Sequence, residues 1–245
     1  MKMKENFIGD IKVTVTDEVH VFNYLGERIE NKIKSKVFFL NAHCFNVAQT
    51  DSMYKENLNS ADVVLNDGIG IDIAAKLFGF QFHQNMNGTD FTPNLLRYAE
   101  EKGYTVYLLG GKPGVAEEAG KNLTNDLKNL QIIGVKDGYF FSNESDVLQD
   151  INQKKPDILI VGLGVPLQEN WISEKISQLD VNVVVGVGAF LDFYSKRVTR
   201  APKWMRNCKL EWLFRLLIEP RRLFKRYVIG IPLFFIYILK GKFIK

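Results

Sequence analysis

The chain has 245 residues, of which 46% are hydrophobic, and a formal net charge of +4. This is enough for a real core in one large domain, or in one domain with an appendage. Cys44 and Cys208 lie far apart and form no CxxC pair, which argues against a disulfide framework or a zinc knuckle and favours a reducing cytosol. Residues 1–13 contain charges but no apolar run, so we expect no signal peptide.

Apolar runs alternate with amphipathic segments along residues 1–199, and this alternation predicts an α/β domain with a mostly parallel sheet. We expect a first helix over Asp17 to Lys34, with Thr16 as its N-cap. The runs that begin at Val106, Ile158 and Val183 are too apolar to alternate, so they should be buried on both faces. The predicted strands are Ile11 to Val15, Val37 to Asn41, Val63 to Leu65, Thr105 to Gly110, Gln131 to Val135, Ile158 to Gly162 and Val183 to Gly186.

Distinctive residues follow five of these strands, and ligands of such sheets bind beyond the carboxyl ends of the strands. Glycine turns at strand ends let backbone N–H groups approach a phosphate, so together these turns predict a nucleotide or sugar-phosphate ligand. One turn alone is weak support, because glycines also serve ordinary tight connections. The turns are Asn41-Ala42-His43, Asn66-Asp67-Gly68-Ile69-Gly70, Gly110-Gly111-Lys112-Pro113-Gly114, Gly162 to Glu169 and Gly186 to Asp192.

Two side chains in these turns are candidate general bases. An acid between a strand and a helix, such as Asp67, most often caps the helix, and the alternative is a base at the sheet edge. His43 is the second candidate, although a single histidine near a strand end is more often a structural hydrogen-bond partner. The sequence has no DxD, no HExxH and no cluster of His and Cys, so we expect no metal and no cofactor. A diphosphate leaving group would then need cationic side chains.

The last 46 residues differ sharply in composition from the rest. Twelve of the 32 Lys and Arg, but only two of the 28 Asp and Glu, lie in residues 200–245, so residues 1–199 have a net charge of −6. This break predicts a body over residues 1–199 and an appendage over residues 200–245. Leu210, Leu213, Phe214 and Leu217 have the spacing of one apolar helix stripe, and Pro220 should end or kink that helix.

Residues 227–239 contain no charge, but they are too short for the ~20 residues of a spanning helix and are interrupted by Gly230 and Pro232. We interpret the appendage as a segment that lies in a membrane interface, on the cytoplasmic face, with Lys and Arg on anionic headgroups. The alternative is a helix pair docked on the core with solvated charges. A nucleic-acid partner is not expected, because a phosphate-binding face would not need so much apolar surface.

Seven blocks, taken in order, resemble the signature blocks of the WecG/TagA/CpsF family of bacterial glycosyltransferases, and they cover essentially the whole chain. The blocks are LNDGIGI at 65–71, MNGTD at 86–90, YLLGGKPGVAE at 107–117, VGLGVPLQENW at 161–171, GVGAFLDFYS at 186–195, RAP at 200–202 and LEWLFRLLIEPRRLFKRY at 210–227.

The resemblance implies the GT-E fold, a Rossmann-like domain with helices on both faces and a C-terminal helical appendage that docks on the membrane. It implies metal-independent, inverting transfer of a sugar, commonly N-acetylmannosamine, from a UDP donor to a polyprenyl-diphosphate-linked saccharide. Asp67 matches the proposed base. Arg215 and Arg222 match arginines proposed to hold the diphosphate, with Lys225 or Arg226 completing the set.

The residues expected to bind substrate come from the strand-end turns and from the matching blocks. They are Asn41, Asn66, Gly88, Thr89, Asp90, Gly110, Gly111, Gly164, Gln168, Glu169, Gly186, Gly188, Lys225 and Arg226. The chain departs from the family pattern at Phe39, where many members have Thr, and at Lys196, where many have Gly. Either change could alter the donor or the acceptor.

Two other functions fit parts of the sequence. A nicotinamide-dependent oxidoreductase would use the same kind of sheet, but no GxGxxG follows the first predicted strand. A non-enzymatic adaptor at the membrane surface would leave the glycine turns unexplained. A homo-oligomer is compatible with the sequence.

Overall fold

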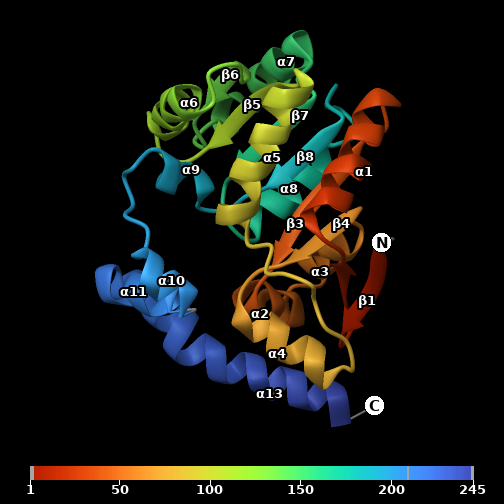
Figure 1. Ribbon diagram of the computed structural model, residues 1–245, viewed down its shortest axis with the longest axis vertical. Helices are drawn as coiled ribbons and strands as arrows, with labels where there is room; N and C mark the ends of the chain where they lie inside the picture. Colours follow the sequence, from red (N-terminus) through yellow and green to blue (C-terminus); the bar gives the residue numbers. More distant parts are fainter. Residues whose placement is uncertain (1–2, 209, 244–245) are drawn as a thin grey trace.

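The computed structural model of the chain describes residues 3–208 and 210–243, and its centre is a six-stranded sheet in which every neighbouring pair is parallel (Figure 1). The strand order is β4-β3-β8-β7-β5-β6. This confirms the predicted mostly parallel sheet. The strands are β3 (Ser35–Leu40), β4 (Val63–Asn66), β5 (Thr105–Gly110), β6 (Gln131–Lys136), β7 (Ile158–Gly162) and β8 (Val183–Gly186).

Helices cover both faces of the sheet. Alternate strand residues point to opposite faces, and apolar side chains on both faces pack against helices. Val37 and Phe39 of β3 join one apolar cluster, and Phe38 and Leu40 join the other. The helices of the first cluster are α1 (Glu18–Glu30), α5 (Gly88–Lys102), α6 (Val115–Asp126) and α9 (Phe190–Tyr194). Those of the second are α2 (Ala42–Thr50), α3 (Ser52–Asn59), α4 (Ile69–Leu77), α7 (Glu144–Lys154) and α8 (Leu167–Lys175), and η1 (Phe141–Asn143) is a short 3-10 turn before α7.

The N-terminal segment differs from the prediction in two respects. The predicted strand Ile11–Val15, β2, pairs antiparallel with β1 (Lys4–Ile8) and lies outside the parallel sheet. It is held beside β4, where Val64 N donates to Thr14 Oγ1 at 3.0 Å. The N-cap of α1 is Asp17 and not Thr16, because the Asp17 carboxylate accepts from His20 N at 3.0 Å.

The C-terminal segment forms a chain of short helices that crosses the lower part of the molecule in Figure 1. As expected, the first long helix ends before Pro220, which occupies the first turn of the next helix. The elements are α10 (Lys203–Asn207), α11 (Glu211–Ile218), α12 (Pro220–Phe224), the π-helical turn η2 (Lys225–Ile229) and α13 (Gly230–Phe243).

Helix α13 packs on the body. The Phe234 and Ile238 side chains are fully buried in the α2/α4 side of the core. Phe234 makes an edge contact with Phe45 of α2 at 5.3 Å between ring centroids, and Asn46 Nδ2 donates to Gly230 O at 2.7 Å. Residues 227–239 therefore combine a docked face with an exposed apolar one. No helix in the described residues is long and apolar enough to cross a bilayer.

Candidate active site

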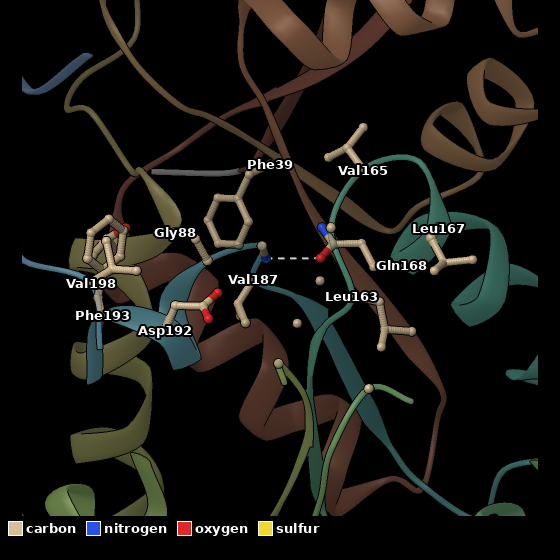
Figure 2. A pocket seen from close by; sticks show the side chains of 18 of the residues that line it. Phe39, Gly88, Leu163, Val165, Leu167, Gln168, Val187, Asp192, Phe193 and Val198 are labelled. Atoms are coloured by element: carbon tan, nitrogen blue, oxygen red, sulfur yellow. Dashed lines mark hydrogen bonds between the residues drawn. The ribbon is translucent and has the colours of Figure 1, made fainter. Parts of the chain in front are cut away.

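The predicted strand-end turns do share one edge of the sheet, where they line a cavity of about 840 Å³ (Figure 2). Side chains of α11, α12 and η2 also line this cavity. In Figure 2, Asp192, Phe193 and Val198 lie on one side of this cavity, Leu167 and Gln168 on the other, and Phe39 and Val187 between them. The predicted site residues in its lining are Asn41, Asp67, Gly88, Thr89, Gly111, Gly164, Gln168, Gly186, Gly188, Arg215, Arg222 and Arg226.

A second cavity of about 410 Å³ lies between α4 and the segment from α11 to α13. It meets the first at a common set of side chains and adds Asp90 to the predicted residues that line a cavity. The residues lining both cavities are Asn41, Asp67, Thr89, Arg215 and Arg226. Asp67 therefore stands where two separate ligands could meet.

Asp67 is held by Asn41, whose Nδ2 donates to Asp67 Oδ2 at 3.0 Å. The N-cap of α4 is Gly68, at φ +91°, and it has no side-chain cap. The interpretation of Asp67 as a helix cap is therefore wrong, and its carboxylate is left facing the cavities. Burial raises the pKa of Asp67, while the hydrogen bond from Asn41 and the charge of Arg226 oppose that rise.

His43 lies in the second cavity, near Arg226. Burial, assisted by the Arg226 charge, lowers its pKa to about 4, so the imidazole is neutral at pH 7. Its backbone N–H donates to Asn41 Oδ1 at 3.0 Å and so takes part in the cap of α2. The predicted structural hydrogen bond of His43 is therefore present, whereas its role as a base stays a prediction.

One backbone amide in each of two glycine turns already has a partner and is therefore not free to bind a phosphate. Gly111 N donates to Gly162 O at 3.0 Å, and Gly188 N donates to Gln168 Oε1 at 2.9 Å. At Gly110, an added Cβ would lie 2.4 Å from Gly162 O. The glycines here let adjacent strand ends approach closely, which opens the cavity above them.

Glu169 is fully buried beneath the cavity and lies outside its lining. Its Oε1 accepts from Gln168 Nε2 at 2.8 Å, so Gln168 is fixed at both ends of its amide. Burial raises the pKa of Glu169 to about 7. Glu169 is therefore placed to orient Gln168 and not to touch a substrate.

Three other predicted residues also lie outside the lining of both cavities: Asn66, Gly110 and Lys225. Asn66 is fully buried, and its Nδ2 donates to Gln84 O at 3.0 Å and Asp72 Oδ1 at 3.1 Å. Lys225 is exposed on η2. Their predicted contacts with substrate have no support in the structure.

Asp90 joins the body to the appendage. Its Oδ1 lies 2.6 Å from Arg200 Nη2, and Arg200 Nε also lies 3.3 Å from Glu211 Oε1 at the start of α11. This ion-pair chain holds α11 beside the N-terminus of α5. Asp90 thus has a structural partner in addition to its place at the second cavity.

The arginines of the appendage that line the cavities differ in their partners. Arg222 is bound by two hydrogen bonds to Glu219, at 2.6 and 2.8 Å. Arg215 lies over the Phe193 ring at 5.1 Å. The Nε atoms of Arg215 and Arg226 are buried and have no hydrogen-bond partner among the described residues, so they can donate to an anionic ligand.

Other lining residues were not among the predicted site residues. Lys112 and Asp192 both line the first cavity. Burial raises the pKa of Asp192, whereas the positive charges of Arg222 and Lys112 oppose that rise. Their signal was present, since both belong to glycine turns that the sequence singled out. Tyr139 and Phe141 follow β6, whose strand end gave no glycine-rich signal as strong as the others.

The two departures from the family pattern have different consequences. Phe39 is 6% exposed, lines the first cavity and lies beside Gly88, where an added Cβ would lie 3.4 Å from its ring. It presents an apolar wall where a hydroxyl would otherwise stand. Lys196 has φ +62° and lies outside both linings, so a glycine there would relieve backbone strain and would not change substrate contacts.

In the described ranges, no three or more His, Cys, Asp or Glu side chains form a group that could hold a metal ion. The sequence matches the family described as "Glycosyl transferase WecG/TagA/CpsF family" over residues 7–245. It is also similar to curated bacterial proteins, over most of both chains.

Three of these relatives carry the name N-acetylglucosaminyldiphosphoundecaprenol N-acetyl-beta-D-mannosaminyltransferase. The Bacillus subtilis protein is 30% identical over 97% of this chain and 92% of its own. The Bacillus spizizenii protein is 33% identical over 79% and 74%, and the Staphylococcus aureus protein 29% over 86% and 83%. The predicted resemblance is thereby confirmed, and the chain belongs to the WecG/TagA/CpsF family of glycosyltransferases.

Proposed function

We propose that this glycosyltransferase moves a sugar from a UDP donor in the first cavity to a polyprenyl-diphosphate-linked saccharide in the second, with inversion at the anomeric carbon. The observation that carries the proposal is the position of Asp67 in the lining of both cavities. A transfer between two bound substrates needs a base at the point where they meet.

The first cavity has the chemistry of a nucleotide-sugar site. Its volume of about 840 Å³ lies within the usual ~300–1,000 Å³ of ligand pockets. Lys112, Arg215 and Arg222 supply positive charge for a diphosphate. Tyr139 and Phe141 offer aromatic faces on which a uracil base could stack.

In the proposed reaction, Asp67 takes the proton from the acceptor hydroxyl while that oxygen attacks the anomeric carbon. The new glycosidic bond forms as the bond between the anomeric carbon and the β-phosphate oxygen breaks, and the electron pair leaves with UDP. Arg215 and Arg226 stabilise the negative charge that develops on the departing diphosphate. Attack from the face opposite the leaving group inverts the configuration.

We propose that the reaction needs no divalent metal and no cofactor, since four cationic side chains of the first cavity can neutralise the leaving group. They are Lys112, Arg215, Arg222 and Arg226. Asn41 serves as the positioning residue of Asp67, through the 3.0 Å hydrogen bond. Thr89 and Asp192 line the same cavity, and we propose that they bind hydroxyl groups of the sugars.

The relatives' names support the choice of substrates. They describe transfer of N-acetylmannosamine to N-acetylglucosaminyl-diphosphoundecaprenol. We propose N-acetylmannosamine or a related hexose as the donor sugar here, in the synthesis of a cell-surface polysaccharide or teichoic acid. The apolar wall at Phe39 gives a reason to test other hexoses, because it removes a possible hydrogen bond to the sugar.

We also propose that the chain is a peripheral protein of the cytoplasmic membrane face, with residues 200–245 as the segment that contacts lipid. Trp204, Leu217 and Phe224 are exposed apolar side chains in this segment. Lys and Arg between them suit an anionic surface. Because α13 packs in the core of the body, residues 200–245 are not a separate folding unit in this proposal. The boundary at residue 200 marks only where the proposed membrane contact begins. Homo-oligomers on the membrane remain part of this proposal.

The experiment that tests the function begins with thermal stability of the full chain in the presence of UDP, UDP-sugars and NADH. A ligand at 100 times its Kd adds ~2.7 kcal/mol of stability. We expect stabilisation by UDP and its sugar conjugates and none by NADH. Transfer to a synthetic N-acetylglucosaminyl diphosphate acceptor then identifies the donor. Stabilisation by NADH alone would favour an oxidoreductase, and stabilisation by no nucleotide would favour a membrane adaptor.

A further inference from the structure

Helix α4 has a second apolar face that the core does not use. Ile71, Ala74 and Ala75 are buried in the core, whereas Ile69, Ile73 and Leu77 are 42, 39 and 41% exposed. The exposed residues are spaced at i, i+4 and i+8, so they form one stripe along the helix. An ordinary surface helix would carry polar side chains on that face.

Helix α13 runs beside α4 in the same direction, away from the catalytic end. An added Cβ on Gly70 would lie 3.4 Å from Phe234, and one on Gly241 would lie 4.0 Å from Phe78. Lys242 Nζ lies 5.6 Å from the centre of the Phe78 ring. The two helices therefore stay together for about two turns, or ~12 Å.

The second cavity opens between these helices. Ile69 and Ile73 of α4 line it, together with Ile231 and Phe235 of α13, which are again spaced at i and i+4. We call these four residues the α4/α13 groove. Leu77 and Leu239 continue the two stripes by one turn each, and both are exposed.

The inner end of the same cavity is polar and carries charges of both signs: Arg206, Arg215 and Arg226 line it together with Asp67, Asp72, Asp90 and Glu211. Arg206 Nη1 lies 3.9 Å from Asp90, whereas the buried Nε atoms of Arg215 and Arg226 have no hydrogen-bond partner among the described residues. A cavity with such arginine N–H donors at the reacting end and hydrocarbon side chains at the outer end is complementary to a diphosphate that carries a hydrocarbon chain. A flat bilayer contact would not require apolar side chains that continue inward to the base.

We propose that the first isoprene units of the acceptor's own polyprenyl chain lie in the α4/α13 groove and set the distance at which its saccharide meets Asp67. This inference rests on the proposed function and adds a binding subsite to it. The groove binds the chain laterally, so the lipid passes from the exposed face of α4 and α13 to the arginines without leaving an apolar surface.

The test compares two acceptors in solution without vesicles: N-acetylglucosaminyl diphosphate with a farnesyl chain, and the same compound with a methyl group. Ile73→Gln changes the groove. Ile236→Gln is the matched control, because Ile236 is an exposed isoleucine of α13 that lies outside the cavity lining. We expect the wild type and Ile236→Gln to have a KM at least tenfold lower for the farnesyl acceptor. Ile73→Gln should lose most of this preference and keep its activity on the methyl acceptor.

Equal preference for the farnesyl acceptor in Ile73→Gln and the wild type would overturn the proposal. Equal loss on both acceptors would also overturn it, because it would indicate a general structural effect. Loss of preference in Ile236→Gln as well would assign the face to nonspecific lipid contact or to a second copy of the chain, and would likewise reject the groove.

A second measurement does not depend on turnover. Isothermal titration of the full chain with farnesyl diphosphate and with inorganic pyrophosphate should show tighter binding of the farnesyl compound, and Ile73→Gln should reduce the difference about tenfold. If this binding pattern is found but no sugar is transferred, the proposed function fails and the groove stands. If transfer occurs but farnesyl diphosphate binds no better than pyrophosphate, the groove fails and the function stands.

Discussion

Asn41 connects the fold to the chemistry of Asp67. Its Nδ2 donates to Asp67 Oδ2 at 3.0 Å, while its Oδ1 accepts from the amides of His43 and Cys44 at the start of α2, both at 3.0 Å. The side-chain amide of Asn41, which follows β3, therefore caps α2 and also holds the carboxylate of Asp67, which follows β4. Leu40 pairs with Asn66 at the ends of these parallel strands, so the sheet fixes the distance between Asn41 and Asp67.

Asp67→Asn should lower kcat by ~10²-fold or more, the usual scale for loss of a general base. The new amide can still accept the hydrogen bond from Asn41, so UDP-sugar binding should change little. Initial rates and titration with UDP-sugar measure the two effects separately. Activity close to that of the wild type would remove Asp67 from the mechanism.

Asn41→Asp separates the two roles of Asn41. Aspartate caps a helix about as well as asparagine, so the cap of α2 should be kept. A second carboxylate next to Asp67 should raise the pKa of Asp67 further and move the acidic limb of the kcat profile to higher pH. Asn41→Ser is the control, since it retains a cap without adding charge. An unchanged pH profile in Asn41→Asp would show that the contact does not influence catalysis.

Much of the fold could be predicted because its strands are short apolar runs between turn residues. The pairing of Ile11–Val15 could not, since a strand's sequence does not name its partner, and this strand pairs within a local hairpin. Residues 230–243 are apolar on most sides, so only the tertiary structure shows that Phe234 and Ile238 face the core.

The site was predicted where the parallel arrangement alone determines position: Asn41 and Asp67 meet because adjacent parallel strands end together. Two predicted substrate-binding residues that lie outside both cavity linings are neighbours of residues that do line a cavity. Asn66 precedes Asp67 and Glu169 follows Gln168, and neighbouring side chains on a strand or helix point in different directions. The partners of the glycine amides depend on contacts between turns, which the sequence of one turn does not contain.

Arg215→Ala should reduce kcat/KM by 10- to 100-fold even with a soluble methyl acceptor, because a hydrogen bond to a charged group contributes ~1.5–3 kcal/mol. Arg221→Ala is the matched control, since Arg221 is exposed and lies outside both cavity linings. EDTA should not affect the wild type. A loss seen only with lipid acceptors would restrict Arg215 to membrane contact, and inhibition by EDTA that Mg²⁺ reverses would refute the metal-free mechanism.

Glu169→Gln should change how stability depends on pH. The pKa of Glu169 is raised from 4.5 to about 7 in the folded chain, so its contribution is present below pH 4.5 and is lost as pH rises towards 7. The loss is ~3 kcal/mol at most, at ~1.4 kcal/mol for each pH unit. Urea unfolding at pH 5 and pH 8 should show a smaller difference for Glu169→Gln than for the wild type. Equal differences would mean that Glu169 is ionised in the fold at both pH values.

The proposed membrane contact of the appendage can be tested without removing α13, whose loss would expose the core. Phe224 and Val228 are exposed on α12 and η2, beside basic residues, and lie outside both cavity linings. The double variant Phe224→Gln/Val228→Gln should reduce cosedimentation with anionic vesicles about tenfold, since buried apolar area drives interfacial binding. Activity on the soluble methyl acceptor should stay unchanged. Met53→Gln, an exposed apolar position on α3, is the control and should bind vesicles like the wild type. If the double variant still sediments as the wild type does, even at low salt, this part of residues 200–245 does not hold the chain to the membrane.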